Sequence, residues 1–296
     1  MISGILVIDK PAGITSRGVV NRVQRWFPKK TKIGHTGTLD PLATGVLVLC
    51  IGKATRLADL VQAMGKSYLA RFRLGATSST DDVDGEVRET LGVTLPNREQ
   101  IDAALAGFCG FIDQVPPKFS ALKVSGERAH DLARFGHEFQ LKPRPVRIDA
   151  IRVLQYEWPY IDLEVDCGKG TYIRSIARDL GTELGCGGLV QTLRRTRVGP
   201  FTVEQGIGVE QSVEEVGRFL LPLSAAVPHL RQFSLELPVA RRLAQGQTVR
   251  IPPRPDHEPR VETVAVVTPD QTLYAIAEDN GRGQLRPVIV LDPRRD

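Results

Sequence analysis

Apolar residues recur along the first three quarters of the chain with two spacings, and each spacing predicts a type of local structure. Continuous or alternating apolar runs, typical of buried and half-buried strands, lie at residues 4–8, 46–51, 66–74, 148–154 and 161–167. Apolar residues three and four positions apart, typical of amphipathic helices, lie at residues 16–26, 97–107 and 172–184. Ser16 is the expected N-cap of the first helix. Strands and helices therefore alternate up to about residue 221.

The pattern changes near residue 234. Short apolar segments separated by glycine and proline follow, at residues 248–251, 261–268, 273–278 and 286–291. The segment 252–259 carries four prolines in eight positions, which predicts an exposed loop. Closely spaced short strands of this kind are typical of a small barrel. We therefore predict a larger domain at residues 1–233 and a small β-barrel-like domain at residues 234–296.

Composition adds limits on the class of protein. With 42% hydrophobic and 25% charged residues in a chain of 296, it is ordinary for a soluble globular protein with a substantial core. No apolar stretch approaches the length of a membrane span, and residues 1–10 resemble a buried strand more than a signal peptide, so a cytoplasmic location is expected. Scattered cysteines without a C-x-x-C pair favour buried thiols over a zinc site: Cys50, Cys109, Cys167 and Cys186.

The charge balance is compatible with a nucleic-acid partner without establishing one. The formal net charge is +5, and basic residues gather at 22–32 and 193–197. The first cluster fits a solvated helix face as well as it fits RNA contact. Charge alone therefore leaves both interpretations open.

The segment 33–47 is the first candidate for chemistry. Its glycines surround one histidine, His35, and one acid, Asp40, directly before a buried strand. Such a loop lets a ligand approach the backbone closely. Asp40 precedes Pro41, which favours extended backbone at Asp40. Aspartate is also a common turn former, so the loop alone does not distinguish a reactive carboxylate from a turn cap.

A second candidate lies at residues 166–181. The turn Gly168-Lys169-Gly170 brings Tyr172 and Arg174 to the start of a predicted helix. A helix N-terminus with an adjacent arginine is suited to hold a carboxylate or a phosphate. The alternative is an exposed tyrosine and a solvated arginine. Phosphate-binding loops, nucleophile elbows and zinc-hydrolase motifs are absent from the sequence.

Together these segments resemble the TruB family of bacterial tRNA pseudouridine synthases. The resemblance covers about residues 1–225 and rests on five segments in the family's order, at 4–16, 34–45, 116–123, 170–185 and 193–201. It implies an α+β fold: a mixed, largely antiparallel sheet with flanking helices, followed by a small RNA-binding barrel of PUA type. His130 and Leu189 stand where the family usually has a tyrosine and a polar or aromatic residue.

The resemblance also assigns the reacting groups. It implies isomerisation of the uridine at position 55, in the T-loop of tRNA, to pseudouridine. Asp40 matches the family's nucleophile, and Arg174 matches the arginine that pairs with this carboxylate. Tyr172 matches a tyrosine of the base pocket. An adjacent arginine would favour the ionised form of Asp40 against the effect of burial.

The remaining matched residues concern the RNA. Tyr68 matches the tyrosine that packs on the target base, and Leu193 matches an apolar residue of the uracil pocket. His35 matches the histidine that props open the T-loop after bases have been flipped out. Lys10 belongs to the first family segment and is grouped with these residues as substrate-binding. Stacking on an aromatic ring is worth about 1–3 kcal/mol per base.

The reaction needs no cofactor or metal, because isomerisation is redox-neutral. The expected partner is tRNA, through its T-arm, with no membrane and no obligatory protein partner, and a monomer is the default. Two alternatives stay open from the sequence: a non-catalytic tRNA-binding protein or folding chaperone, and a related synthase that acts on a different RNA. The set Asp40, Tyr68 and Arg174 argues against the first, because binding alone needs no carboxylate facing a phosphate-rich ligand.

Overall fold

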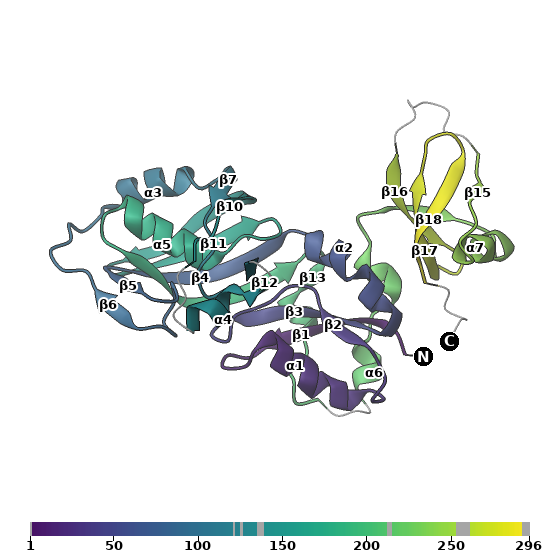
Figure 1. Ribbon diagram of the computed structural model, residues 1–296, viewed down its shortest axis with the longest axis horizontal. Helices are drawn as coiled ribbons and strands as arrows, with labels where there is room; N and C mark the ends of the chain where they lie inside the picture. Colours follow the sequence, from purple (N-terminus) through teal and green to yellow (C-terminus); the bar gives the residue numbers. More distant parts are fainter. Residues whose placement is uncertain are drawn as a thin grey trace.

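The computed structural model describes residues 2–120, 122–124, 127–134, 139–211, 215–252 and 261–291. Its larger part is built on a nine-stranded sheet (Figure 1). The main path through this sheet runs β1 (Gly4–Lys10), β3 (Thr44–Ile51), β12 (Gly188–Val198), β4 (Lys66–Leu74), β11 (Tyr160–Cys167), β10 (Arg144–Glu157) and β7 (Gly110–Gln114). Two short strands extend it, β2 (Ile33–His35) beside β3 and β13 (Phe201–Thr202) beside β12.

Pairing in this sheet is parallel between β3 and β12 and antiparallel between the other described neighbours. The prediction of a mixed, largely antiparallel sheet is therefore confirmed. The strand predicted at 66–74 is β4 with the same bounds, and the strands predicted at 148–154 and 161–167 pair as β10 and β11. Alternation in the sequence located these strands because one face of each is buried.

The predicted helices are present with slightly shorter bounds. They are α1 (Ser16–Val23), α3 (Arg98–Ala106) and α5 (Ile173–Glu183). The first prediction was wrong at its start, because Thr15 is the N-cap: its side chain accepts a hydrogen bond from the Gly18 N–H. Ser16 is the first helical residue, and its side chain is buried. After Val23 the chain continues as a short 3₁₀ helix, η1 (Gln24–Trp26).

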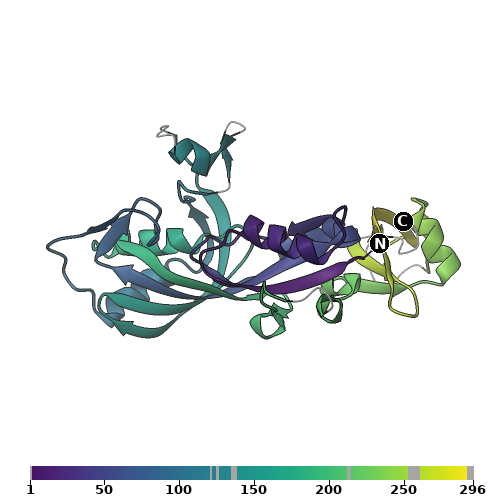
Figure 2. The same cartoon turned by 90° about the horizontal axis from the view of Figure 1, so that it is seen from below.

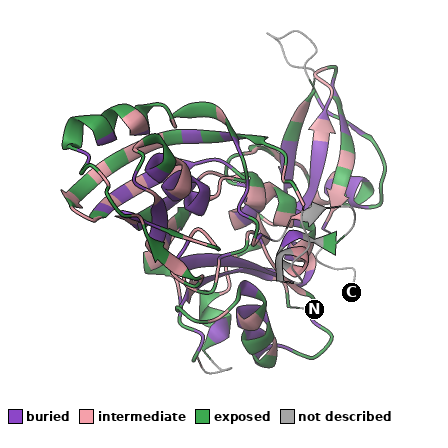
Figure 3. Cartoon of the chain, turned by 60° about the vertical axis from the view of Figure 1, so that its left-hand side comes forward, coloured by how far each residue is buried: buried purple, intermediate pink, exposed green. Residues whose placement is uncertain are grey.

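The two faces of the sheet contribute to different hydrophobic cores. Alternate residues of β1 show the division: Leu6 and Ile8 belong to the core that also contains α1, α3 and α5. Ile5 and Val7 belong to a second core, which they share with η2 (Gly52–Leu57) and α2 (Ala58–Ala63). Buried segments run along the inner strands, while the outer surfaces of the helices are exposed (Figure 3).

The C-terminal part forms a second, five-stranded sheet (Figure 1). Its order is β14 (Arg231–Ser234), β16 (Glu262–Val267), β17 (Leu273–Asp279), β18 (Gln284–Val290) and β15 (Val249–Arg250), and α7 (Leu237–Ala244) packs on β17 and β18. Among the described residues the edge strands β14 and β15 do not pair, so the sheet is open and the predicted closed barrel is not observed. Strand β14 spans the predicted boundary at 233. Most of the proline-rich segment at 252–259 lies outside the described residues.

The two sheets share the second core. Val267, Leu273 and Ile276 of the C-terminal sheet belong to the same hydrophobic cluster as β1 residues. The Arg56 guanidinium donates a hydrogen bond to the Val290 carbonyl, which adds a polar link. The link between the two parts of the chain is therefore a packed apolar interface.

The shorter elements connect or project from this framework. They are β5 (Ala76–Ser78), β6 (Val87–Glu89), β8 (Lys123–Val124), β9 (Glu127–Arg128), α4 (Ala129–Arg134), η3 (Val203–Gln205), α6 (Val216–Phe219) and η4 (Leu223–Ala226). The segment of β8, β9 and α4 stands away from the body (Figure 2). No described helix has the length and apolar character needed to cross a membrane. Three cysteines are buried as expected, whereas Cys109 is exposed, and all four thiols are free.

Candidate active site

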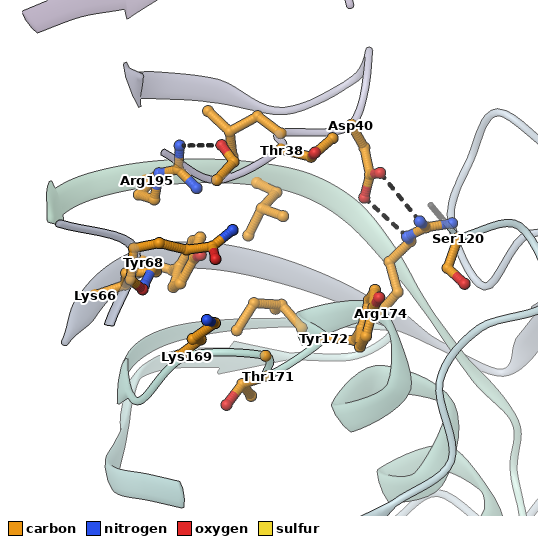
Figure 4. A pocket seen from close by; sticks show the side chains of 16 residues that line it. Thr38, Asp40, Lys66, Tyr68, Ser120, Lys169, Thr171, Tyr172, Arg174 and Arg195 are labelled. Carbon is orange, nitrogen blue, oxygen red and sulfur yellow. Dashed lines mark hydrogen bonds and ion pairs between the residues drawn. The ribbon is translucent and has the colours of Figure 1, made fainter. Parts of the chain in front are cut away.

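A cavity of about 230 Å³ lies where the loop between β2 and β3 meets β4, β12 and the start of α5 (Figure 4). The loop contributes residues 37–40, and the turn before α5 contributes residues 169–174. Strands β4 and β12 form its floor with Lys66, Tyr68, Leu193 and Arg195. Segments far apart in the sequence therefore meet here, including both segments singled out for chemistry.

The loop that carries Asp40 is held by hydrogen bonds on both sides of that residue. On one side, the Ser16 hydroxyl accepts from the Leu39 N–H at 2.8 Å and donates to the Leu39 carbonyl at 3.0 Å. On the other side, the Pro41 carbonyl accepts from the Lys10 ammonium at 3.3 Å. Because both neighbours are fixed, the carboxylate starts from an ordered backbone.

Arg174 holds the Asp40 carboxylate through both of its oxygens (Figure 4). Nη2 of Arg174 donates to Oδ1 of Asp40 at 3.0 Å. Nε lies 2.9 Å from Oδ2, close enough for an ion pair, although its N–H does not point along a hydrogen bond. The Arg174 side chain is 4% exposed and that of Asp40 is 32% exposed. The carboxylate is therefore oriented from the protein side while it remains open to the cavity.

A second carboxylate, Asp82, shares this arginine. Asp82 lies 3.3 Å from Nη1 of Arg174, and its side chain is 4% exposed. Burial raises the pKa of Asp82, opposed by a hydrogen bond from Thr80 and by the charge of Arg174. The arginine also donates to the carbonyls of Thr80 at 2.8 Å and Phe119 at 3.0 Å. Three groups besides Asp40 thus fix the guanidinium that orients it.

The start of α5 is positioned by Gln114 on the edge strand β7. Its amide oxygen accepts from the Tyr172 N–H at 2.8 Å, and its amide nitrogen donates to the Tyr172 carbonyl at 3.1 Å. This places Tyr172 at the cavity wall beside Arg174. Burial raises the pKa of the Tyr172 phenol, and the charge of Asp40 adds to the effect, so the phenol stays protonated at neutral pH. Nothing in the local sequence pattern indicated the role of Gln114.

Tyr68 and Leu193 provide the apolar part of the cavity floor. In the register between β4 and β12, Tyr68 pairs with Arg195 and Leu193 pairs with Ala70, so the four residues occupy neighbouring positions. The Tyr68 side chain is buried in the cavity floor, and burial raises its pKa. A flat ring beside an aliphatic side chain forms a platform of the size of one base.

His35 and Lys10 do not line the cavity. Lys10 is fully buried and also donates to the carbonyls of Pro11 at 2.9 Å and Ile14 at 2.7 Å. In the structure Lys10 holds the backbone of the loop that carries Asp40. Direct contact between Lys10 and the substrate stays a prediction. His35 lies on β2, half-buried, and burial followed by the charges of Arg195 and Arg17 lowers its pKa. The neutral form of the His35 imidazole is therefore favoured, at the end of β2 where the loop begins.

The remaining observations concern metal binding and the departures from the family pattern. Among the residues that the structure describes, no group of three or more His, Cys, Asp or Glu side chains is arranged to hold a metal ion. Leu189, which departs from the family pattern, is fully buried on β12. The His130 side chain lies outside the described part of the chain.

Comparison with known proteins agrees with this geometry. Residues 25–173 match a family model described as TruB family pseudouridylate synthase (N terminal domain). Residues 174–227 match one described as tRNA pseudouridylate synthase B C-terminal domain. A protein of Caulobacter sp. (strain K31) named tRNA pseudouridine synthase B is 45% identical over 93% of this chain and 89% of its own length. One of Arthrobacter sp. (strain FB24) with the same name is 40% identical over 100% of this chain and 99% of its own.

Solved structures show the same fold. The chain is similar to a protein in the crystal structure of a Cbf5-Nop10-Gar1 complex, with a TM-score of 0.74 and 26% identity over 98% of this chain and 85% of that one. A chain in the structure of an H/ACA RNP bound to a substrate RNA containing 2'-deoxyuridine gives a TM-score of 0.73 at 25% identity, over 98% of this chain and 86% of that one. The predicted pseudouridine synthase fold is thereby confirmed.

Proposed function

Because the chain belongs to the TruB family of pseudouridylate synthases, we propose that it isomerises a uridine of tRNA to pseudouridine. The observation that carries the proposal is the Asp40 carboxylate, held by Arg174 at the edge of a base-sized cavity. The target is uridine 55 in the T-loop. No cofactor enters the reaction, because its atoms balance within the nucleoside.

The chemistry assigns a task to each side of the cavity. The N1–C1′ bond breaks, its electron pair passes to the uracil, the ring turns over, and C5 bonds to C1′ while C5 loses a proton and N1 gains one. Asp40, aimed by Arg174, starts this sequence as the nucleophile or base. Tyr68 and Leu193 hold the ring while it is detached, and Tyr172 closes the wall beside it. The cavity confines the uracil so that it recombines and does not escape.

The target base must leave the folded T-loop to reach this cavity. Extrusion costs a few kcal/mol of stacking and pairing, which contacts in the pocket offset. His35 occupies the space that the base vacates. A neutral imidazole suits that task, because it stacks among bases without a charge to solvate. Lys10 contributes by holding the loop backbone.

The test is the substitution Asp40→Asn, which keeps the size of the side chain and removes its charge. Pseudouridine formation on a tRNA transcript should fall by at least about 10²-fold, with unchanged thermal stability and tRNA affinity. Asp102→Asn, on the exposed face of α3, is the matched control. If Asp40→Asn retains wild-type turnover, Asp40 has no part in the mechanism. If the wild-type protein binds tRNA and forms no pseudouridine, the protein is a binding protein or folding chaperone.

Mapping of the product separates the remaining alternative. A wild-type digest should contain new pseudouridine at position 55 of tRNA. Pseudouridine found only in another RNA would identify a related synthase with a different target. Light scattering of the free and the tRNA-bound protein tests the monomer, which acts in the cytoplasm without an obligatory protein partner.

Residues 234–296 serve as a PUA-like RNA-binding unit next to the catalytic domain at 1–233. Support comes from the exposed Arg241 and Arg242 in the last turn of α7 and Arg250 on β15. Replacement of Arg241 and Arg242 by Gln should weaken tRNA binding and reduce its dependence on salt, with an unchanged rate once the tRNA is bound. Normal affinity and an unchanged salt slope would count against an RNA-binding role.

A further inference from the structure

Three cations line the end of the cavity away from Asp40. They are Lys66 at the start of β4, Arg195 on β12 and Lys169 in the turn before α5 (Figure 4). Arg195 and Lys66 are 2% and 7% exposed, and Lys169 is at the surface. The cavity therefore has two differently charged ends joined by the apolar floor of Tyr68 and Leu193.

Arg195 is held by two backbone oxygens and lies against the Tyr68 phenol. Its Nε donates to the Val46 carbonyl at 2.7 Å, and Nη2 donates to the Gly37 carbonyl at 3.1 Å. Nη1 lies close to Gly37, where a Cβ would be 3.6 Å away. The charge of the guanidinium and its hydrogen bond with the Tyr68 phenol oppose the burial that raises the pKa of that phenol. The guanidinium is thus fixed in position with donors left over on the cavity side.

Lys66 is arranged in the same way. Its ammonium donates to the carbonyls of Gln62 at 2.8 Å and Met64 at 2.7 Å, which leaves one of its three N–H groups. Burial and the charges of Arg195 and Lys169 together lower the pKa of Lys66 to about 8, and Cys167 opposes them. Keeping Lys66 charged in this position therefore costs free energy.

No carboxylate compensates these charges within the described part of the chain. Arg195, Lys66 and Lys169 form no ion pair there, and Asp40 at the other end is already engaged by Arg174. Buried charges are ordinarily paired, because removing an ion from water costs several kcal/mol. Two buried cations with spare donors that face one cavity indicate that the missing negative charge comes with the ligand.

We propose that Lys66 and Arg195, with Lys169 at the rim, form an anion subsite that binds a negatively charged oxygen of the flipped uridine nucleotide. This inference rests on the proposed function and identifies a further part of the same site. Tyr68 and Arg195 are cross-strand neighbours, so a base stacked on Tyr68 places its own edge or its adjoining backbone beside the guanidinium. The oxygen has two possible sources: a phosphate next to the target, or the uracil ring after its N1–C1′ bond has broken.

The test uses Lys66→Met and Arg195→Lys in the full-length protein, with Lys169→Met as an exposed variant that does not disturb the core. Arg197→Gln is the control, because Arg197 lies on the same strand and pairs with Asp166, outside the cavity. Affinity is measured for a T-arm RNA and for the same RNA with uncharged methylphosphonates next to the target. The single-turnover rate is measured on the normal RNA. Thermal melting confirms that each variant is folded.

Two results support the subsite and separate its sources. If the oxygen belongs to a phosphate, Lys66→Met should bind the normal RNA at least tenfold more weakly than wild type, and its affinity should depend less on salt. The same substitution should not change the affinity for the methylphosphonate RNA. The uracil charge predicts unchanged affinity and at least a tenfold slower single turnover. The subsite is refuted if Lys66→Met and Lys169→Met stay within twofold of wild type in both measurements, or if Arg197→Gln has the same effect. Binding to the RNA does not require turnover, so failure of Asp40 as nucleophile would be detected separately.

Discussion

Ser16→Ala should slow the reaction although Ser16 does not line the cavity. The hydroxyl makes two hydrogen bonds to the backbone of Leu39, the residue before Asp40. The described structure provides these two backbone groups with no other partner. A buried polar group left unsatisfied costs about 1–3 kcal/mol, so the free energy of unfolding should fall by about 2–4 kcal/mol. For a chain of this length, that corresponds to a melting temperature lower by about 4–10 °C.

The effect on the rate follows from position. A reacting group displaced by about 1 Å loses up to about 10²-fold in rate, so Ser16→Ala should slow single turnover by about 10- to 100-fold. The affinity for tRNA should stay unchanged, because the side chain is buried. Release of tritium from C5-labelled uridine in tRNA measures the rate directly, since the isomerisation expels that hydrogen.

Thr15→Ala is the matched control on the same helix terminus. Thr15 is exposed and caps α1 through the Gly18 N–H, with no hydrogen bond to the loop of Asp40. Its loss should cost about 1 kcal/mol of stability and leave the rate unchanged. The reasoning is refuted if Ser16→Ala keeps a rate within twofold of wild type, or if Thr15→Ala slows turnover equally.

Three further predictions concern backbone and charge. Gly45→Ala should prevent stable folding, because φ is +98° and a Cβ would lie 2.1 Å from a backbone oxygen of β12, whereas Gly34→Ala, with open space around it, should melt normally. Asp82→Asn should leave stability at pH 7 equal or higher: the folded pKa of Asp82 is raised, so its ionisation opposes folding at neutral pH, and the advantage should vanish in melts near pH 4. The free energy of unfolding should rise between about pH 8 and 10.5. Lys66 and Lys10 each have a pKa of about 8 in the folded protein, so in this range the folded state has released protons that the unfolded chain still holds. The same titration of Lys66→Met should show a smaller rise.

The packing of the two sheets changes how the C-terminal part should be tested. Deletion from residue 234 onward would remove Val267, Leu273 and Ile276 from the core shared with β1. Such a truncation would lower stability as well as RNA affinity, and the two effects could not be separated. Surface substitutions on α7 avoid this difficulty. In the sequence alone, the pattern of apolar segments changes near residue 234, and nothing in it indicates that the two parts share a core.

Local patterns located most of the framework. Alternation predicted β4 at its observed bounds, and apolar spacing predicted α3 and α5, because each element buries one face regardless of what covers it. Family segments located the carboxylate, the arginine and the aromatic platform. Local patterns did not fix the polar ends of elements. Thr15 and Ser16 both suit a helix start, but in the structure Thr15 caps α1 and Ser16 holds the loop of Asp40.

What the sequence by itself determined is therefore the set of elements and the identity of Asp40, Tyr68, Tyr172, Arg174 and Leu193 as candidates. The tertiary structure alone decided which groups act on them. Asp82 and Arg174 are 92 positions apart in the chain, and only the fold brings the carboxylate to 3.3 Å from the buried guanidinium. Arg195 looked like one of several basic residues until its strand register placed it next to Tyr68, with no carboxylate paired to it among the described residues. The physical reason is that burial and charge compensation depend on neighbours across the sheet, which spacing along one chain does not specify.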